Sequence, residues 1–201
     1  MEKMEIRLSA EGYQPVNLGY PSRDHSIEVL AEKAISPALK KCEGSKEINF
    51  VTHSLGGILV RQYLSTHEIP NLKYVVMLGP PNKGSEVVDK LQDVPGFHFI
   101  NGDAGLQLGT SEFSLPNKLG VPKFNVGIIA GNQSINWILS FLIPGRDDGK
   151  VSIERTKLKG MNDHIEISTT HPFMMKNKNV ISQVIYYLKN GEFERTVRHN
   201  N

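Results

Sequence analysis

Residues 47–63 of the chain read EINFVTHSLGGILVRQY. An apolar run leads into His-Ser-Leu-Gly-Gly, and apolar residues then recur at helical spacing. The pattern predicts a strand, a sharp turn that lifts Ser54 clear of the backbone, and an amphipathic helix. A serine hydroxyl held in this way becomes a strong nucleophile when a histidine base lies beside it. At the start of the helix, the amide of Leu55 is expected to point toward a developing oxyanion.

The residues on either side of Ser54 decide whether such a sharp turn is sterically possible. The side chains two positions before and two positions after the serine crowd each other, and Gly56 meets the need for a small residue at the second position. At the first position stands Thr52 in place of the usual glycine, which weakens the Gly-x-Ser-x-Gly pattern. Gly57 is expected to let the helix pack close to the strand. An ordinary strand-to-helix turn with an incidental serine is the alternative interpretation.

Composition favours one domain spanning residues 1–201. The chain has 201 residues, 39% hydrophobic content and a net charge of +2, which is enough for a substantial core. Its lysines are scattered, and aromatic residues do not alternate with arginines as a base-stacking surface would require, so nucleic acid is not an expected partner.

Cysteine and histidine usage argues against a metal site or a disulfide. Cys42 is the single cysteine, so no internal disulfide can form. The pair Asp163-His164 has no third ligand at a recognisable spacing, and we predict no metal and no cofactor.

The sequence contains no apparent targeting or membrane segment. No stretch approaches the ~18–20 apolar residues of a membrane span, and the opening residues MEKMEI are too charged for a secretory signal. The sequence therefore predicts a soluble, cytoplasmic protein; export would require a segment upstream of Met1.

Strand and helix patterns alternate along the chain. Apolar runs of the kind found in buried parallel strands occupy 47–52, 72–78 and 123–129, and further strands are expected at 14–18 and 164–167. Helical periodicity marks residues 1–11, 27–41, 55–66 and 180–188. Alternation of this kind predicts an α/β fold, with a mostly parallel sheet covered by helices on both faces.

Two long connections, 82–120 and 132–147, are expected to form a cap or lid over the site. The second contains an apolar cluster that includes Trp137, Leu139, Phe141 and Leu142. It can be interpreted as a short core helix or as the wall of an apolar, substrate-binding pocket above Ser54.

A nucleophilic serine needs a base and an orienting acid, which in such folds follow in the order Ser, acid, His. Asp148 follows the strand at 123–129 and stands directly before Gly149, which suits a tight turn that presents the carboxylate. We therefore prefer it to Asp147, which we expect to be solvated. His171 follows the strand at 164–167 and is the preferred base.

The other six histidines are weaker candidates for the base. His53 is expected to pack or hydrogen-bond beside the turn, and His164, at the start of a strand, is the second choice. The remaining four are expected at the surface: His25, His67, His98 and His199.

These residues resemble the α/β-hydrolase superfamily, and within it the bacterial lipases and carboxylesterases whose nucleophile turn reads Gly-His-Ser-Leu-Gly-Gly. The likeness extends to Tyr20-Pro21-Ser22, to residues 79–85 (GPPNKGS), to residues 148–151 (DGKV) and to the late His171. It implies that Ser54 forms the acyl-enzyme, His171 is the general base, Asp148 orients it and the Leu55 amide is one oxyanion donor. It further implies a small ester or lipid substrate and no cofactor.

The chain departs from this family at its beginning. Relatives start with an apolar strand ending in His-Gly, which supplies a second oxyanion donor and lies between the strands expected here at 14–18 and 47–52. Three outcomes are open: those two strands close up, a neighbouring copy pairs into the gap as a homo-oligomer, or Met1 is not the true start. Loss of one oxyanion donor typically costs ~10²–10³-fold in rate.

The leading hypothesis is an esterase or lipase that cleaves carboxylic esters through an acyl-serine intermediate. A thioesterase or acyltransferase would use the same three residues. The alternative from another class is a weak or silent hydrolase-like scaffold that binds a ligand or partner.

Overall fold

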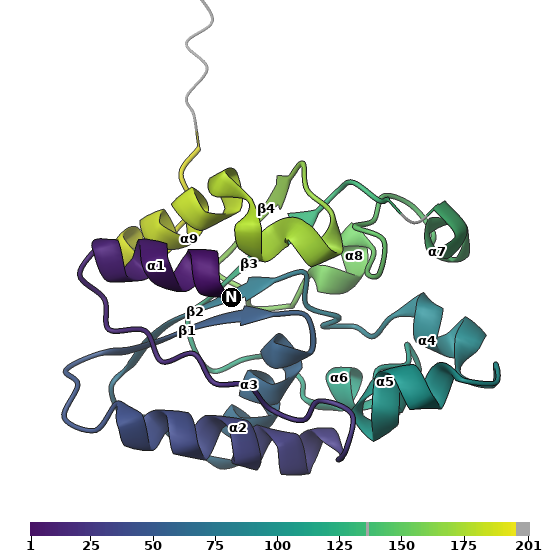
Figure 1. Cartoon of the computed structure of the whole chain (residues 1–201), viewed down its shortest axis with the longest axis horizontal. Helices are drawn as coiled ribbons and strands as arrows, with labels where there is room; N and C mark the ends of the chain where they lie inside the picture. Colours follow the sequence, from purple (N-terminus) through teal and green to yellow (C-terminus); the bar gives the residue numbers. More distant parts are fainter. Residues whose placement is uncertain (136, 196–201) are drawn as a thin grey trace, which may run out of the picture.

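The structure is a computed structural model, and it describes residues 1–135 and 137–195. Its centre is a four-stranded sheet in which every neighbouring pair of strands is parallel (Figure 1). The strands lie in the order in which they occur in the sequence: β1 (Ile48–His53), β2 (Leu72–Leu78), β3 (Val126–Gly131) and β4 (Asp163–Ile167).

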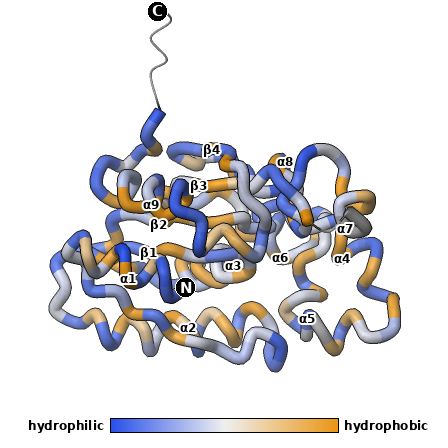
Figure 2. Tube along the Cα trace, turned by 45° about the horizontal axis from the view of Figure 1, so that its top comes forward, coloured by the Kyte–Doolittle hydropathy of each residue, from blue (hydrophilic) through white to orange (hydrophobic). Residues whose placement is uncertain are grey.

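Helices cover both faces of this sheet, as the alternating pattern predicted (Figure 1). On one face lie α1 (Glu2–Ala10), α9 (Lys178–Asn190) and the 3₁₀ helix η1 (His171–Lys176), which share an apolar core with the sheet. On the other lie α2 (Ile27–Lys41) and α3 (Leu55–Thr66), which form a second core. The buried second half of β2 (75–78) and the whole of β3 are mostly hydrophobic, whereas α2 alternates between hydrophobic and polar residues (Figure 2).

The expected α/β architecture, a parallel sheet with helices on both faces, is confirmed, and several elements match their predicted bounds. The helix expected at 55–66 and the strand expected at 72–78 have the predicted limits. Such agreement follows from strong periodicity, because the apolar face of α3 and the continuous apolar run of β2 each have one way to be buried. None of the helices in the described ranges is long and apolar enough to cross a membrane.

The prediction of a strand at 14–18 is wrong. Those residues have no regular structure, and β1 is an edge strand whose described partner is β2 alone. A cavity separates this segment from β1, so the two do not close up against each other. Within the described residues, neither stretch has a partner for its backbone groups on the side that faces the cavity.

The long connections contain more regular structure than expected. Residues 82–120 include α4 (Glu86–Leu91), α5 (Phe97–Leu106) and α6 (Leu115–Lys118), and the second connection includes α7 (Trp137–Leu142). The short helix α8 (Ile153–Thr156) follows. Helices α4 to α7 gather beyond the carboxyl ends of the strands (Figure 1).

A buried arginine ties the first of these connections to α3. The guanidinium of Arg61 donates to the carbonyl oxygens of Asn82, Pro116 and Gly120 at 2.9–3.1 Å. Burial lowers the pKa of Arg61 to about 10. Both ends of the 82–120 segment are thereby fixed beside the carboxyl edge of the sheet.

Candidate active site

The turn after β1 places Ser54 in a backbone conformation that residues with a side chain rarely adopt. Its φ is 54° and its ψ is −123°, and it is the single non-glycine residue with positive φ in the described part of the chain. The Ser54 amide donates to the Leu78 carbonyl at 2.9 Å, so the strained turn is anchored to β2. Backbone strain of this kind costs about 1–3 kcal/mol and is concentrated at functional sites.

Thr52 is compatible with this turn. A Cβ added to Gly56 would lie 3.4 Å from the Thr52 Cβ, which is ordinary van der Waals contact, so Thr52 does not crowd the position of Gly56. A Cβ on Gly57 would lie 3.1 Å from the Pro80 Cβ, which shows how closely α3 packs at this point. The departure from the Gly-x-Ser-x-Gly pattern therefore leaves the turn intact.

The structure brings Ser54, His171 and Asp148 together from three different loops. The Nε2 atom of His171 lies 2.9 Å from the Ser54 Oγ, and its Nδ1 atom lies 2.7 Å from the Asp148 Oδ2. These loops follow β1, β4 and β3. Because the strands are parallel, all three loops meet at the carboxyl edge of the sheet.

The carboxylate of Asp148 is buried and held from two directions. Asp148 is 1% exposed and His171 is 4% exposed. The second carboxylate oxygen, Oδ1, accepts hydrogen bonds from the amides of Lys150 and Val151 at 3.0 and 2.9 Å. The His171 amide donates to the Asp148 carbonyl at 2.8 Å. These bonds leave Oδ2 aimed at the imidazole and fix the relative position of the two residues.

Asp147 is buried, so the expectation that it is solvated is wrong. It is 8% exposed, and its Oδ1 accepts bonds from the Gly149 amide at 2.6 Å and the Ser140 hydroxyl at 2.8 Å. The turn needs acceptors for its amides, and both neighbouring aspartates supply one. The two carboxylates point in different directions: that of Asp148 faces His171, and that of Asp147 faces Ser140 and the Gly149 amide.

His53 supports the loop that carries His171. Its Nε2 lies 2.9 Å from the His171 carbonyl oxygen, which can only accept, so His53 carries its proton on Nε2. The two rings lie 4.7 Å apart between centroids. Burial lowers the pKa of His53 to about 4, and the neighbouring His171 adds to this effect. His53 therefore remains neutral near pH 7 and hydrogen-bonds as expected.

The recorded contacts of the other described histidines are with residues other than Ser54. His164, the second choice for the base, lies on β4 with its Nε2 3.1 Å from the Thr156 hydroxyl. His25 contacts Lys33, His67 stacks on Tyr63, and His98 pairs with Asp103. His199 lies outside the described residues. In the described residues, no group of three or more His, Cys, Asp or Glu side chains is arranged to hold a metal ion.

Leu55 begins α3, so its amide belongs to the first turn of a 12-residue helix. Amides of a first turn have no acceptor within their own helix, and the helix dipole favours negative charge there. Leu55 directly follows Ser54 in the sequence, and its role as an oxyanion donor stays a prediction.

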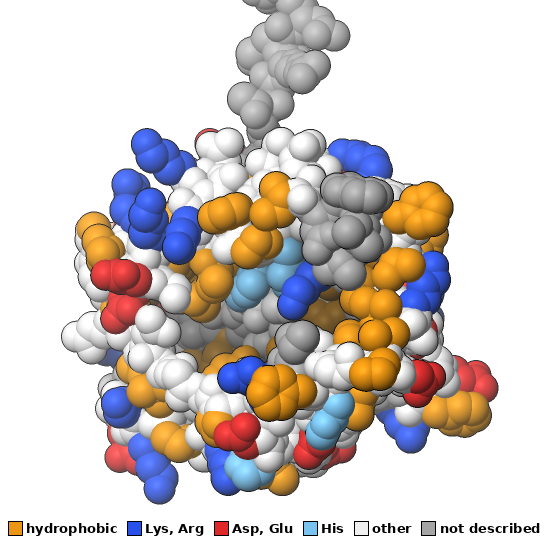
Figure 3. All heavy atoms as spheres, turned by 45° about the vertical axis from the view of Figure 1, so that its right-hand side comes forward, with side chains coloured by type: hydrophobic (Ala, Val, Ile, Leu, Met, Phe, Trp, Pro, Cys, Tyr) orange, Lys and Arg blue, Asp and Glu red, His pale blue; other side chains and the backbone are white. Residues whose placement is uncertain are grey.

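The apolar cluster of the second connection is only partly described. The side chains of Trp137 and Leu139 lie outside the described ones. Phe141 is 88% exposed and Leu142 is partly exposed, whereas the following Ile143 is 4% exposed. Helix α7 packs against α4, and the Lys90 ammonium donates to the Leu142 carbonyl at 2.7 Å. The face that carries these elements is hollowed, with histidine side chains at the edge of the hollow (Figure 3).

Gly79 lies against the candidate site, although the sequence analysis gave it no role beyond its place in residues 79–85. It follows β2 with a φ of +53°, and a Cβ at this position would lie 2.8 Å from the Asp148 Oδ2 and 3.2 Å from the His171 Nδ1. The backbone of the residue after β2 thus packs directly against the Asp148–His171 pair. The glycine that follows an apolar strand was the available signal.

We expect Gly79→Ala to lower ester hydrolysis by about 10–100-fold, because the new methyl group would displace the Asp148–His171 pair. Gly145→Ala is the matched control: Gly145 also has positive φ, at 82°, but a Cβ there meets nothing within 4 Å. Kinetics of both variants with a p-nitrophenyl ester, at equal folded concentration, test this. Equal losses in both variants would contradict it.

No protein-family model and no curated protein sequence matches this chain. Several solved structures have the same fold. A lipase of Bacillus licheniformis, BlEst2 in its mature form, superposes with a TM-score of 0.68 over 94% of this chain and 83% of that one, at 18% identity. An esterase of Exiguobacterium antarcticum, EaEST, superposes with a TM-score of 0.55 over 94% and 86%, at 14% identity.

The phospholipase PlaB of Legionella pneumophila is also similar. Its TM-score is 0.56, at 18% identity, over 77% of this chain but only 41% of PlaB. Together these similarities show that the chain has the α/β-hydrolase fold, shortened to four parallel strands.

Proposed function

We propose that the protein is a carboxylic ester hydrolase that works through an acyl-serine intermediate. The observation that carries this proposal is the chain of contacts from the Asp148 Oδ2 to the His171 Nδ1 (2.7 Å) and from the His171 Nε2 to the Ser54 Oγ (2.9 Å). A buried carboxylate that orients an imidazole against a strained serine is the arrangement that activates a hydroxyl. Lipases, esterases and a phospholipase share this fold, and this similarity supports the same class of reaction.

In the first half of the reaction, the Ser54 Oγ attacks the ester carbonyl carbon while its proton passes to the His171 Nε2. Asp148 stabilises the imidazolium, and the Leu55 amide donates to the oxyanion. The tetrahedral intermediate then collapses. The bond to the alcohol oxygen breaks, and the His171 Nε2 gives its proton to the departing alcohol.

In the second half, water attacks the acyl-serine and His171 takes its proton. Collapse releases the carboxylic acid and returns the proton to Ser54. A thioester would follow the same path, and an acyl acceptor in place of water would give acyl transfer. No cofactor takes part in any of these steps.

The apolar side chains of α7 are proposed to contact the acyl part of the substrate. Phe141 is 88% exposed on a six-residue helix beside the carboxyl edge of the sheet. We propose that Trp137, Leu139, Phe141 and Leu142 together form the wall above the substrate, with 82–120 as the rest of the cap. The substrate is then an ester with an apolar acyl group, as in a small ester or a lipid.

Reaction with a fluorophosphonate tests the proposal, because only an activated serine hydroxyl displaces fluoride from phosphorus. We expect mass spectrometry to find the label on Ser54 and none in Ser54→Ala. The label should also be lost in His171→Ala, whose serine remains present but has no base. A folded protein that does not react would contradict the proposal and favour a silent binding scaffold.

A further inference from the structure

The outer edge of β1 has a regular row of unpaired backbone groups. The Ile48 amide bonds to the Asn71 carbonyl and the Ser54 amide to the Leu78 carbonyl, so even-numbered residues of β1 face β2. Backbone N–H and C=O groups of one residue point to the same side of a strand. Those of Asn49, Val51 and His53 therefore point away from β2, and no described residue pairs with them.

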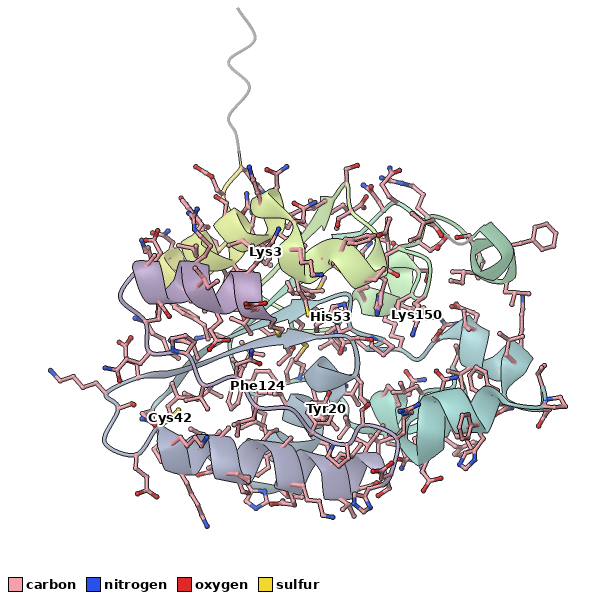
Figure 4. All side chains as sticks on the ribbon, in the orientation of Figure 1. Lys3, Tyr20, Cys42, His53, Phe124 and Lys150 are labelled. Carbon is pink, nitrogen blue, oxygen red and sulfur yellow. The ribbon has the colours of Figure 1, made fainter. Side chains whose placement is uncertain are left out.

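A cavity of about 820 Å³ lies along this edge. Its opposite wall is the segment 13–20, in which the Tyr13 amide alone makes a recorded backbone bond, to the Leu8 carbonyl. Figure 4 labels three of the residues that line it: Cys42 towards one end, and Tyr20 and His53 towards the other. Two stretches of backbone with free hydrogen-bonding groups thus border one cavity.

The other two walls are apolar and come from opposite faces of the sheet. Met4 and Leu8 of α1 line one of them, and Ile35 of α2 and Leu59 of α3 line the other. The charged side chains among the lining residues are Glu5, Lys46 and Glu47. Lys46 and Glu47 precede β1 and therefore lie at the end away from Ser54, whereas Glu5 lies on α1. An occupant would be buried on both faces and would meet two of the three charged side chains at the end away from Ser54.

The backbone groups decide what kind of molecule fits. The volume lies within the range of about 300–1,000 Å³ that small-molecule sites have, so an acyl chain or a peptide could be accommodated. An acyl chain would bury the amides of Asn49, Val51 and His53 without acceptors, which is unfavourable because each buried donor loses its hydrogen bond to water. A peptide strand supplies donors and acceptors at the spacing of β1, which spans six residues or about 20 Å.

We propose that this cavity, called here the β1 slot, binds an extended strand supplied by a partner polypeptide. The strand pairs with Asn49, Val51 and His53 and extends the sheet by one member. A strand covered on both faces is apolar along its whole length. The partner segment is therefore about five residues long, uncharged and rich in Val, Ile or Leu, with any flanking charge near Lys46 and Glu47.

The β1 slot reaches the candidate active site. Thr52, His53 and Gly56 line its inner end, and they flank Ser54 in the sequence. A bound strand would therefore end beside the nucleophile, where its last amide could donate to the oxyanion. This consequence, unlike the binding itself, rests on the proposed function, and it predicts about 10-fold or more faster ester hydrolysis when the slot is filled.

Cys42, the single cysteine, lines the β1 slot and reports its occupancy. The probe is a capped peptide with a core of five Val and Ile residues and one terminal lysine. We expect it to slow alkylation of Cys42 by N-ethylmaleimide at least tenfold, and to slow hydrogen exchange of the Asn49, Val51 and His53 amides. The control is a peptide of the same sequence with every core amide N-methylated, which has the same apolar side chains but no backbone donor for either edge. We expect it not to bind.

Matched variants separate this site from the active site. Ala38 lines the β1 slot, and Ala38→Phe should abolish protection of Cys42 by the peptide while Ser54 still reacts with a fluorophosphonate. Ala10→Phe makes the same change on an exposed position outside the lining and should leave peptide binding unchanged.

Four results would overturn the inference. Dodecanoate that protects Cys42 where the peptide fails would identify an acyl-chain site. Protection that grows with protein concentration alone, together with a dimeric mass, would identify a second copy as the occupant. Slow exchange of the three amides in the protein alone would mean that the edge is already paired. Equal protection by the N-methylated and the unmethylated peptide would exclude strand pairing. Because none of these readouts needs turnover, failure of Ser54 to react with the fluorophosphonate would refute only the proposed function.

Discussion

Ser54→Ala is expected to reduce turnover of p-nitrophenyl butyrate by about 10⁴–10⁶-fold, the loss seen when a serine nucleophile is removed from a working triad. The substitution removes the atom that lies 2.9 Å from the His171 Nε2 and leaves the base without a hydroxyl to deprotonate. The turn should survive, because the anchoring bond to Leu78 comes from the backbone amide.

Ser65→Ala is the matched control for this prediction. Ser65 lies on the same helix, α3, and its exposed hydroxyl donates only to the Gln62 carbonyl within that helix. We expect it to retain the full rate. Turnover that persists in Ser54→Ala, at a protein concentration where Ser65→Ala is active, would show that another group performs the reaction.

Asp148→Asn is expected to lower kcat by about 10⁴-fold with little change in KM. The amides of Lys150 and Val151 require an acceptor at Oδ1, so the asparagine must place its carbonyl oxygen there. Its NH₂ group would then face the His171 Nδ1 and donate to it. The imidazole proton would move to Nε2, which could no longer accept the proton of Ser54.

Asp147→Asn makes the same chemical change at the adjacent residue. The Oδ1 of Asp147 accepts from the Gly149 amide and the Ser140 hydroxyl, and an amide oxygen can accept both bonds. We expect less than about a fivefold change in kcat. Steady-state kinetics of the two variants, with thermal unfolding to establish that both are folded, test the assignment. Similar losses in both would indicate that the loop, rather than the carboxylate facing His171, is what matters.

The sequence by itself determined those elements whose apolar pattern has a single way to be buried. The bounds of α3 and β2 follow from local periodicity, and the parallel sheet follows from their alternation. The sequence also brought out Ser54, Asp148 and His171 as candidates, because loops after parallel strands meet at one edge. That prediction rested on the order of these residues, on the strands expected before them and on Gly149 beside Asp148.

Tertiary structure alone decided the features that depend on contacts between distant residues. Asp147 is buried because Ser140 and the Gly149 amide lie within reach, although its sequence surroundings indicate a solvated turn. Gly79 meets Asp148 and His171 only after β2, β3 and β4 have paired. Residues 14–18 have the composition of a strand but no partner. Strand formation requires backbone pairing as well as propensity, and the place of that partner is occupied by the cavity beside β1.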